Sequence, residues 1–535
     1  MYTKELFHSW VPKVLQKIFL FVLAIPLLVG SSIYTANMGD MYSGLGTYAE
    51  TLTFANYSST IGMMVGLGVI LKIKPRFKSK NIIVFAFISL GLLTLAIGST
   101  QRIDIIVVCS VIMGFIKVFG MIELVVPIMF IVSPKGDRGE FYVVFYPLIL
   151  GASQLVGFLT ANLAYNLNWN AVYLMSAIIL FGCALLCIAL MHNKWTAKRM
   201  PIKGLDWFSI VSFTAACLLL NYILVFAKQQ GWFYASMNLR LALAAFIICA
   251  ALFIYRQRTA AIPFFSLAIF TKRRVLTAIV LFSLMGMFTA TSSLQSALTS
   301  ILQYDARTNA TINLAMIPGI ILGGFICAMW FKREGSTRSL LFIAFSCFLL
   351  NTICLYFLIS PVVDIRYFIL PTFAKGLGMA LVYISGGFYF ASSLKPTELM
   401  GAYPVVIGIR SFIGTAFFSA VFSWGLYQFQ SDSMMELANG MDTMDAWVQA
   451  RGGGMQLYAS VRTQSTLIAV KELFGYTALA GILVLVYILL HPFHHLHRRQ
   501  LIIRRKRLKG ESIDGLRAES FDGKDITATA ASVST

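Results

Sequence analysis

Residues Ile105–Val132 read IIVVCSVIMGFIKVFGMIELVVPIMFIV, an apolar run long enough to cross a bilayer as a helix. The run nevertheless contains two charged residues, Lys117 and Glu123. A charge at the bilayer centre costs about 2.5–3.5 kcal/mol on insertion scales, and such charges usually face a bundle interior or a wet cavity. This stretch therefore indicates a membrane helix whose two charges mark either a transport pathway or buried structural pairs.

The spacing of the two charges argues against a pair within their own helix. At about 100° and 1.5 Å per residue, Lys117 and Glu123 point about 120° apart and lie about 9 Å apart along the axis. Side chains on one helix pair at spacings of three or four residues. Each charge is therefore expected to find its partner on another helix, in the substrate, or in a proton.

Composition extends the membrane assignment to the whole chain. Of 535 residues, 58% are hydrophobic and 12% are charged, about half the charged fraction of soluble domains. The net charge of +21 comes from basic residues in short segments between apolar runs, which excludes a nucleic-acid-binding surface as its explanation. The eight cysteines all fall inside apolar runs, with neither a disulfide framework nor zinc spacing.

The apolar runs predict an all-α polytopic membrane protein with 14 transmembrane helices. The first run is read as a retained helix and not as a cleaved signal peptide, because no small-residue cleavage site follows it. The predicted spans are 14–36, 56–72, 81–100, 105–132, 141–164, 169–191, 207–227, 239–255, 275–302, 311–331, 339–360, 367–392, 401–428 and 473–490.

The loops that are rich in Lys and Arg set the expected orientation. With fourteen spans, the basic segments after spans 2, 6, 8, 10 and 14 all lie on one side, and the opposite loops hold few basic residues. The positive-inside rule then places both termini in the cytoplasm. Two longer segments, 37–55 and 429–470, are expected on the outer side, and the second should contain an amphipathic helix that leads into the last span.

The end of the chain is polar or basic. His491, His494, His495 and His497 follow the last span, and we interpret them as interfacial residues and not as a metal site. Residues 496–535 are predicted to form a basic segment that attracts anionic lipid, followed by a disordered tail.

Several short motifs carry a resemblance to a known family. The loop PRFKSK after span 2 resembles a D-R-x-G-R-K-like signature through Arg76 and Lys80, although proline and lysine replace its acid and glycine. LGASQLVGFL in span 5 resembles G-x-x-x-G-P-x-x-G through Gly151 and Gly157, without the proline. Better matches are NWNAVYLM in span 6, AKGLGMAL in span 12, where Lys375 takes the place of an arginine, and RSFIGTAFFSA in span 13.

These motifs resemble the major facilitator superfamily, specifically its fourteen-span drug:proton antiporters, the EmrB/QacA-like exporters. The resemblance implies two six-helix halves with two inserted helices, which rock about a midplane site. The domains it implies are an N-terminal half at 1–200, a linker pair at 201–260, and a C-terminal half at 261–495 that carries the outer loop 429–470. It also implies that spans 1, 4, 9 and 12 line the cavity.

The charged and polar residues inside the spans are the candidate site. Glu123 is the first candidate for proton coupling because it is the one acid well inside a clearly apolar span; Asp40 and Glu50 at the outer mouth are alternatives. Lys117, Lys375 and Arg410 make the interior net cationic, which favours lipophilic anions or neutral amphiphiles as substrates. Structural pairing of these cations remains open. Polar cavity candidates are Asn37, Gln154 and Gln295, and motif or gating candidates are Arg76, Lys80, Gly114, Gly120, Gly151, Gly157, Gly376 and Gly378.

The predicted function is proton-coupled efflux of amphiphilic or drug-like small molecules in a bacterial inner membrane. Import or uniport of a lipophilic anion remains open. A membrane-embedded acyltransferase is a weaker alternative, because no cluster of nucleophilic residues is found beyond the terminal histidines. No cofactor and no ATP site are expected, since no Gly-rich nucleotide-binding loop is present. By analogy, segment 429–470 is a candidate docking site for a periplasmic adaptor protein linked to an outer-membrane channel.

Overall fold

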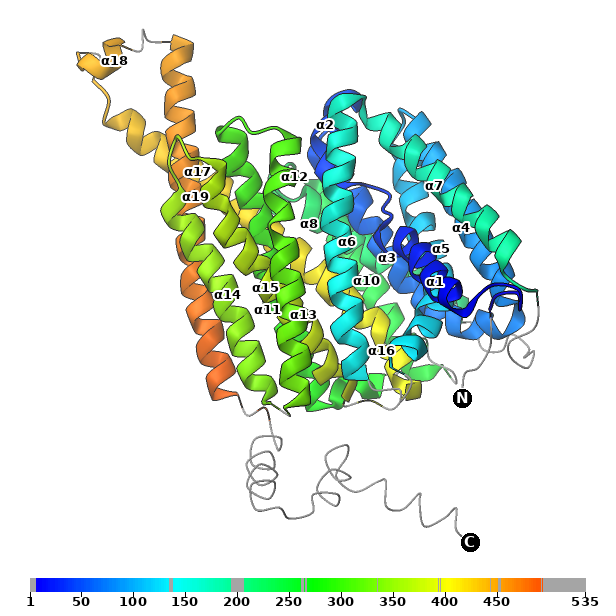
Figure 1. Cartoon of the computed structure of the whole chain (residues 1–535). Helices are drawn as coiled ribbons and strands as arrows, with labels where there is room; N and C mark the ends of the chain where they lie inside the picture. The colour runs from blue at the N-terminus through cyan, green and yellow to red at the C-terminus, as the bar shows by residue number, and fades with distance from the viewer. Residues whose placement is uncertain are drawn as a thin grey trace, which may run out of the picture.

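Helices make up almost all of the described structure. The computed structural model describes residues 6–133, 138–193, 206–260, 264, 267–333, 335–392, 394, 396–442, 444–450, 454–491 and 493. Within these residues the one β-type pairing is an isolated antiparallel bridge between Phe7 and Met191. Most of the long helices run roughly along one direction of the bundle (Figure 1). Three of the four terminal histidines and the tail 496–535 lie outside the described residues.

The helix bounds follow the apolar runs closely. The α-helices are α1 Lys13–Val29, α2 Met38–Leu45, α3 Ala49–Ile73, α4 Ser79–Ser99, α5 Ile103–Val132, α6 Arg138–Asn166, α7 Trp169–Leu190, α8 Trp207–Phe226, α9 Trp232–Ala235, α10 Met237–Thr259, α11 Arg273–Ile301, α12 Ala306–Leu314, α13 Met316–Lys332, α14 Thr337–Leu358, α15 Ile369–Ser392, α16 Pro396–Gly408, α17 Gly414–Asn439, α18 Ala446–Ala450 and α19 Gly454–Leu490. Short 3₁₀ or π turns are η1 Thr35–Asn37, η2 Lys74–Arg76, η3 Leu267–Thr271, η4 Ile365–Phe368 and η5 Ile409–Ile413.

Twelve helical segments of the described chain are long and apolar enough to cross a membrane. They correspond to predicted spans 3–14, so the multi-pass, all-helical prediction is confirmed for these segments. The first two predicted spans are present as helices, α1 with 17 residues and α3 with 25.

The prediction of one continuous helix over 14–36 was wrong. Helix α1 ends at Val29, and the chain continues through an irregular stretch into η1 and α2. The sequence PLLVGSS explains the break: Pro26 removes one backbone donor from the last turn, and Gly30 caps the helix through its N–H to the Pro26 carbonyl. The following segment 37–55 is also not a loop, because α2 and the first turns of α3 occupy it.

The outer segment 429–470 is more helical than expected. Helix α17 continues to Asn439 and α19 begins at Gly454, with the short helix α18 between them. A helix leading into the last span is present, as predicted, and forms the first part of α19. This hairpin projects beyond the rest of the bundle at the upper left of Figure 1.

The same pattern of helix packing occurs twice along the chain. In the first part α3 packs on α5, and α4 packs on both α5 and α7; in the later part α13 packs on α15, and α14 packs on both α15 and α19. The two parts meet where α6 packs on α13 and where α3 packs on α16. The fold therefore contains two sets of helices with matching neighbours.

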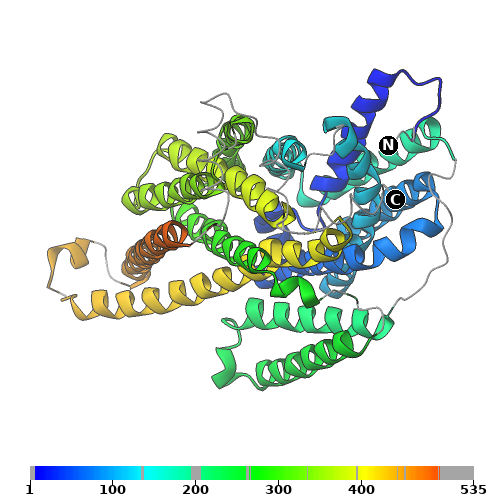
Figure 2. The same ribbon diagram turned by 90° about the horizontal axis from the view of Figure 1, so that it is seen from below.

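Helices α8 and α10 pack on each other beside this assembly, and α8 contacts α3 (Figure 2). The Asp206 carboxylate begins α8 and accepts a 2.8 Å hydrogen bond from Arg256 Nε near the end of α10. Burial raises the pKa of the Asp206 carboxyl, but hydrogen bonds from Arg256 and Ser209 outweigh it, so the net pKa lies below its ordinary value. An ion pair thus ties the two helices together at one end.

Candidate functional site

Lys117 is held by the interruption in α1. Its Nζ, on α5, donates a 2.6 Å hydrogen bond to the carbonyl oxygen of Gly30, directly after the last residue of α1. Carbonyls at a helix C-terminus lack partners within the helix and carry the negative end of its dipole. The charge of Lys117 is therefore balanced by the Gly30 carbonyl group, which is available as an acceptor because α1 ends at Val29.

Glu123 also has a partner outside its own helix. The carboxylate is 4% exposed, and its Oε1 lies 3.2 Å from Nζ of Lys74, which follows α3 directly. This oxygen accepts no well-aligned hydrogen bond within the described residues, so charge attraction is the main contribution. Lys117 and Glu123 thus have separate partners on α1 and η2, as the helical spacing predicts.

Lys375 has a different environment from Lys117. Its side chain, on α15, is 6% exposed, and no hydrogen-bond or ion-pair partner for it is found among the described residues. Gln295 on α11, 8% exposed, likewise has none there. Asn351 on α14 is 1% exposed, and neither atom of its amide has a partner in the described part of the chain. Buried polar groups without partners are uncommon and each needs an explanation.

Arg410 lies where three helical segments meet. It belongs to the π-helical turn η5, and its guanidinium carbon lies 4.4 Å from the ring centre of Tyr383 and 5.7 Å from that of Tyr146. Such positions over aromatic faces stabilise a cation. Tyr142 on α6 and Tyr403 on α16 share a hydrogen bond between their hydroxyls. These contacts connect α6, α15 and α16, and π-helical turns occur frequently at functional sites.

Asn37 and Gln154 come from neighbouring elements. Asn37 ends η1, is 2% exposed, and has no partner for either amide atom within the described residues. Gln154 is half-buried on α6, and η1 packs on α6. The structure therefore places the two residues on elements that pack against each other.

The predicted glycines divide into two groups. A Cβ on Gly114 would lie 1.8 Å from the carbonyl oxygen of Ser59 on α3, and one on Gly376 would lie 2.4 Å from that of Met316 on α13. Gly120 and Gly378 are similarly crowded, so these four allow close helix approach. Gly151 has no atom within 4 Å of its added Cβ, and Gly157 has only Ala36 at 4.0 Å.

The two basic motif residues, Lys80 and Arg76, also have different environments. Lys80 Nζ donates 2.7 Å hydrogen bonds to the carbonyl oxygens of Ile188 and Met191, which connects the start of α4 to the end of α7. Arg76 is exposed in η2.

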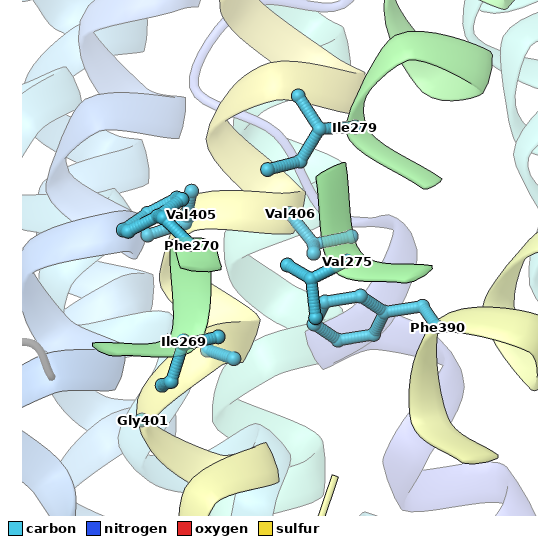
Figure 3. Close-up of a pocket in the computed structure, with 9 residues that line it drawn as sticks. Ile269, Phe270, Val275, Ile279, Phe390, Gly401, Val405 and Val406 are labelled. Atoms are coloured by element: carbon cyan, nitrogen blue, oxygen red, sulfur yellow. The ribbon is translucent and has the colours of Figure 1, made fainter. Parts of the chain in front are cut away.

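A small pocket lies elsewhere, between η3, α11, α15 and α16, with an empty volume of about 240 Å³ (Figure 3). Its nine lining residues are all apolar or glycine, including Phe270, Phe390 and Val406. None of the predicted site residues lines it.

Sequence reasoning overlooked Lys74 and Asn351. Lys74 stands in the basic loop after span 2, where its charge was accounted for by membrane orientation. Asn351 could have been identified from the sequence, because it is a lone amide in the apolar run FLLNTICL. A strongly polar side chain at such a position usually faces the protein interior.

No family model and no curated protein sequence matches the chain. Among solved structures, a mutant of the nucleoside transporter NupG superposes with a TM-score of 0.55 at 11% identity, covering 87% of this chain and 99% of the other. PepTSo2 gives 0.54 at 13% identity, covering 88% and 97%. A POT peptide transporter in complex with sulfate gives 0.54 at 14%, covering 88% and 94%. The chain therefore shares the fold of these transporter structures over most of its length.

Proposed function

We propose that this chain is a secondary active transporter that exports amphiphilic or drug-like small molecules in exchange for protons. The observation that carries the proposal is the position of half-buried Lys117 on α5 and buried Lys375 on α15, two helices that occupy corresponding places in the two helix sets. Intramembrane charges of this kind usually mark substrate or ion pathways. Solved structures of the same fold, described as nucleoside and peptide transporters, support a transport function.

The architecture we propose has fourteen spans, with α1 and α3 crossing as the first two. The N-terminal half is 1–200, the C-terminal half is 261–495, and 201–260 forms the inserted pair. The repeated packing of α3 on α5 and of α13 on α15 supports this division. Both termini are then cytoplasmic, together with the basic loops. In support, Lys80 contacts the end of α7 and Arg338 donates to His491 beyond α19, as one common face requires.

Glu123 is the residue that we propose couples transport to protons. When ionised, its carboxylate attracts Lys74 across the α3–α5 contact. A proton on Glu123 would remove that attraction and leave the end of α3 free to separate from α5. Protonation would thus bias the helix arrangement, which is the requirement for coupling in an alternating-access mechanism.

The second candidate function is import or uniport of a lipophilic anion. Lys375 favours an anion, because this cation is buried without a partner among the described residues. The direction of transport is set by which gradient drives the cycle, and both directions can use the same binding site.

A substrate panel in an efflux-deficient bacterial host tests the proposed export. Expression of the chain should raise resistance to several amphiphilic compounds, and a proton uncoupler should abolish that gain. The Lys375→Ala variant at equal membrane abundance is the matched control. Increased sensitivity to the same compounds would instead establish import and overturn the proposed direction.

We also propose that the projecting hairpin of α17, α18 and α19 docks a periplasmic adaptor protein in the bacterial envelope. It extends beyond the bundle (Figure 1) and exposes Met435, Met444, Met455 and Tyr458 by 49–80%. Replacing 441–453 with a short Gly-Ser linker should remove crosslinks to an adaptor while the protein still inserts. Undiminished crosslinking would exclude this hairpin as the docking site.

A further inference from the structure

The two lysines inside the helices, Lys117 and Lys375, lie in matching sequence and structural positions. Residues 115–121 and 373–379 share the pattern F-x-K-x-x-G-M, with Lys117 and Lys375 at its third position. The glycine contacts agree: Gly66 of α3 faces the Phe115 carbonyl, and Gly319 of α13 faces the Phe373 carbonyl. The two lysines therefore occupy equivalent places in the two helix sets.

Their partners nevertheless differ, because the neighbouring first helices differ. Helix α1 ends at Val29, and the Gly30 carbonyl beyond it accepts from Lys117. The corresponding helix of the later set, α11, is unbroken from Arg273 to Ile301. Carbonyls inside a continuous helix already accept from its own N–H groups. Lys375 consequently lacks the backbone acceptor that satisfies Lys117.

Two contacts establish which part of α11 lies beside Lys375. The Phe282 ring faces Gly386 near one end of the α11–α15 contact, and the Tyr304 hydroxyl donates to the Val363 carbonyl near the other. The two helices therefore run antiparallel. Gly386 lies eleven residues after Lys375, and eleven residues after Phe282 on the antiparallel α11 is residue 293, so Lys375 lies within about one helical turn of the level of Gln295.

Helix α14 brings Asn351 to the same level. The Phe348 ring lies 3.3 Å from a Cβ placed on Gly378. Asn351 is three residues after Phe348, and Lys375 is three residues before Gly378 on the antiparallel helix α15. Helices α11, α14 and α15 all contact one another, so the three polar residues share one level of this helix cluster.

The side chains at this level comprise one cation and two amides, and they include no anion. Lys375 supplies an ammonium group, and Asn351 and Gln295 supply amide N–H groups, each more than nine-tenths buried and with no partner in the described residues. A buried unsatisfied group costs about 1–3 kcal/mol, and more when it is charged. An anionic acceptor would satisfy the ammonium group with a charge-assisted hydrogen bond.

We infer that Lys375, Asn351 and Gln295 form the subsite for the carboxylate, or an equivalent anionic group, of an amphiphilic substrate, and that Lys117 is a positioning residue that holds the break in α1. This inference rests on the proposed transport function and names its substrate class. It assigns different roles to Lys117 and Lys375, although the two lysines lie in the same sequence pattern.

Binding of a charged and an uncharged probe of the same shape tests this assignment. The probes are 1-naphthylacetate and 1-naphthylacetamide, titrated into the full-length protein in lipid nanodiscs and followed by naphthalene fluorescence. Wild type should bind the acid at least about tenfold more tightly than the amide. Lys375→Met should remove that preference, whereas Lys375→Arg should keep most of it.

The Lys117→Met variant is the matched control. It should lower the thermal midpoint and weaken both probes alike, because it acts through the α1 break. Asn351→Leu should weaken the acid selectively by about threefold or more, and it serves in place of Lys375→Met if that variant does not elute as a single species. The subsite is overturned if wild type shows no preference for the acid, or if Lys117→Met removes the preference and Lys375→Met does not.

These binding results are separable from transport. Acid-selective binding that depends on Lys375, in a protein that moves no substrate, would retain the subsite and reject the proposed function. Transport without charge-selective binding would retain the function and reject the subsite.

Discussion

Replacing Gly114 with leucine is expected to prevent α3 and α5 from packing and to lower the yield of folded protein severely. A Cβ alone would lie 1.8 Å from the Ser59 carbonyl oxygen and 3.1 Å from the Met63 nitrogen. Both are backbone atoms, so no change of side-chain rotamer can relieve the overlap. Overpacking in a well-packed interior costs about 1–3 kcal/mol and occasionally more, and a leucine against backbone falls at the upper end. Size-exclusion profiles and thermal midpoints in detergent measure the effect.

Gly151 provides the control for this experiment. It is also a membrane-helix glycine, but no atom lies within 4 Å of its added Cβ. Gly151→Leu should therefore elute as wild type does, with a thermal midpoint within a few degrees. If Gly114→Leu behaves like Gly151→Leu, the close approach of α3 and α5 described above is wrong.

The second large effect is expected at Glu123. Glu123→Gln keeps the shape of the side chain but removes the charge that attracts Lys74 and the group that could exchange a proton. Proton-driven transport should fall by at least tenfold while the protein still inserts. The measurement is substrate accumulation against an imposed pH gradient, normalised to protein in the membrane.

Two variants separate coupling from simple anchoring. Asp104→Asn changes an exposed acid in the first turn of the same helix and should leave coupling intact. Lys74→Gln breaks the ion pair but keeps the titratable carboxyl, so it should alter the pH dependence of transport and not abolish it. Full proton-driven transport by Glu123→Gln would remove this residue as the coupling site.

The sequence predicted the helices better than their interruptions. Apolar length decides whether a segment can cross a bilayer, so spans 3–12 were located within a few residues, whereas the helices of spans 13 and 14 extend well beyond their apolar runs. The break at Gly30 and the π-helical turn around Arg410 depend on how backbone groups find partners in the assembled bundle. The run FLFVLAIPLLVGSSIYTANM contains no charged residue across the break, so the charge pattern does not mark the point where the helix ends.

The sequence identified candidate site residues, but it did not identify the groups that they contact. Helical spacing separated Lys117 from Glu123, and the structure gives them different partners. The identity of those partners could not be predicted, because Lys74 resembled any cytoplasmic loop lysine and the Gly30 carbonyl is not a side chain. For the same reason, the sequence does not distinguish Lys117 from Lys375. The difference follows from the structure, in which α11 is continuous and α1 ends at Val29.

The most direct test of proton-coupled transport uses the purified full-length protein in sealed liposomes with an imposed pH gradient and the best compound from the resistance panel. Proton coupling through Glu123 predicts accumulation above the equilibrium concentration, with collapse on adding an uncoupler and none for Glu123→Gln. Equilibration at the same rate with and without the gradient would contradict proton coupling.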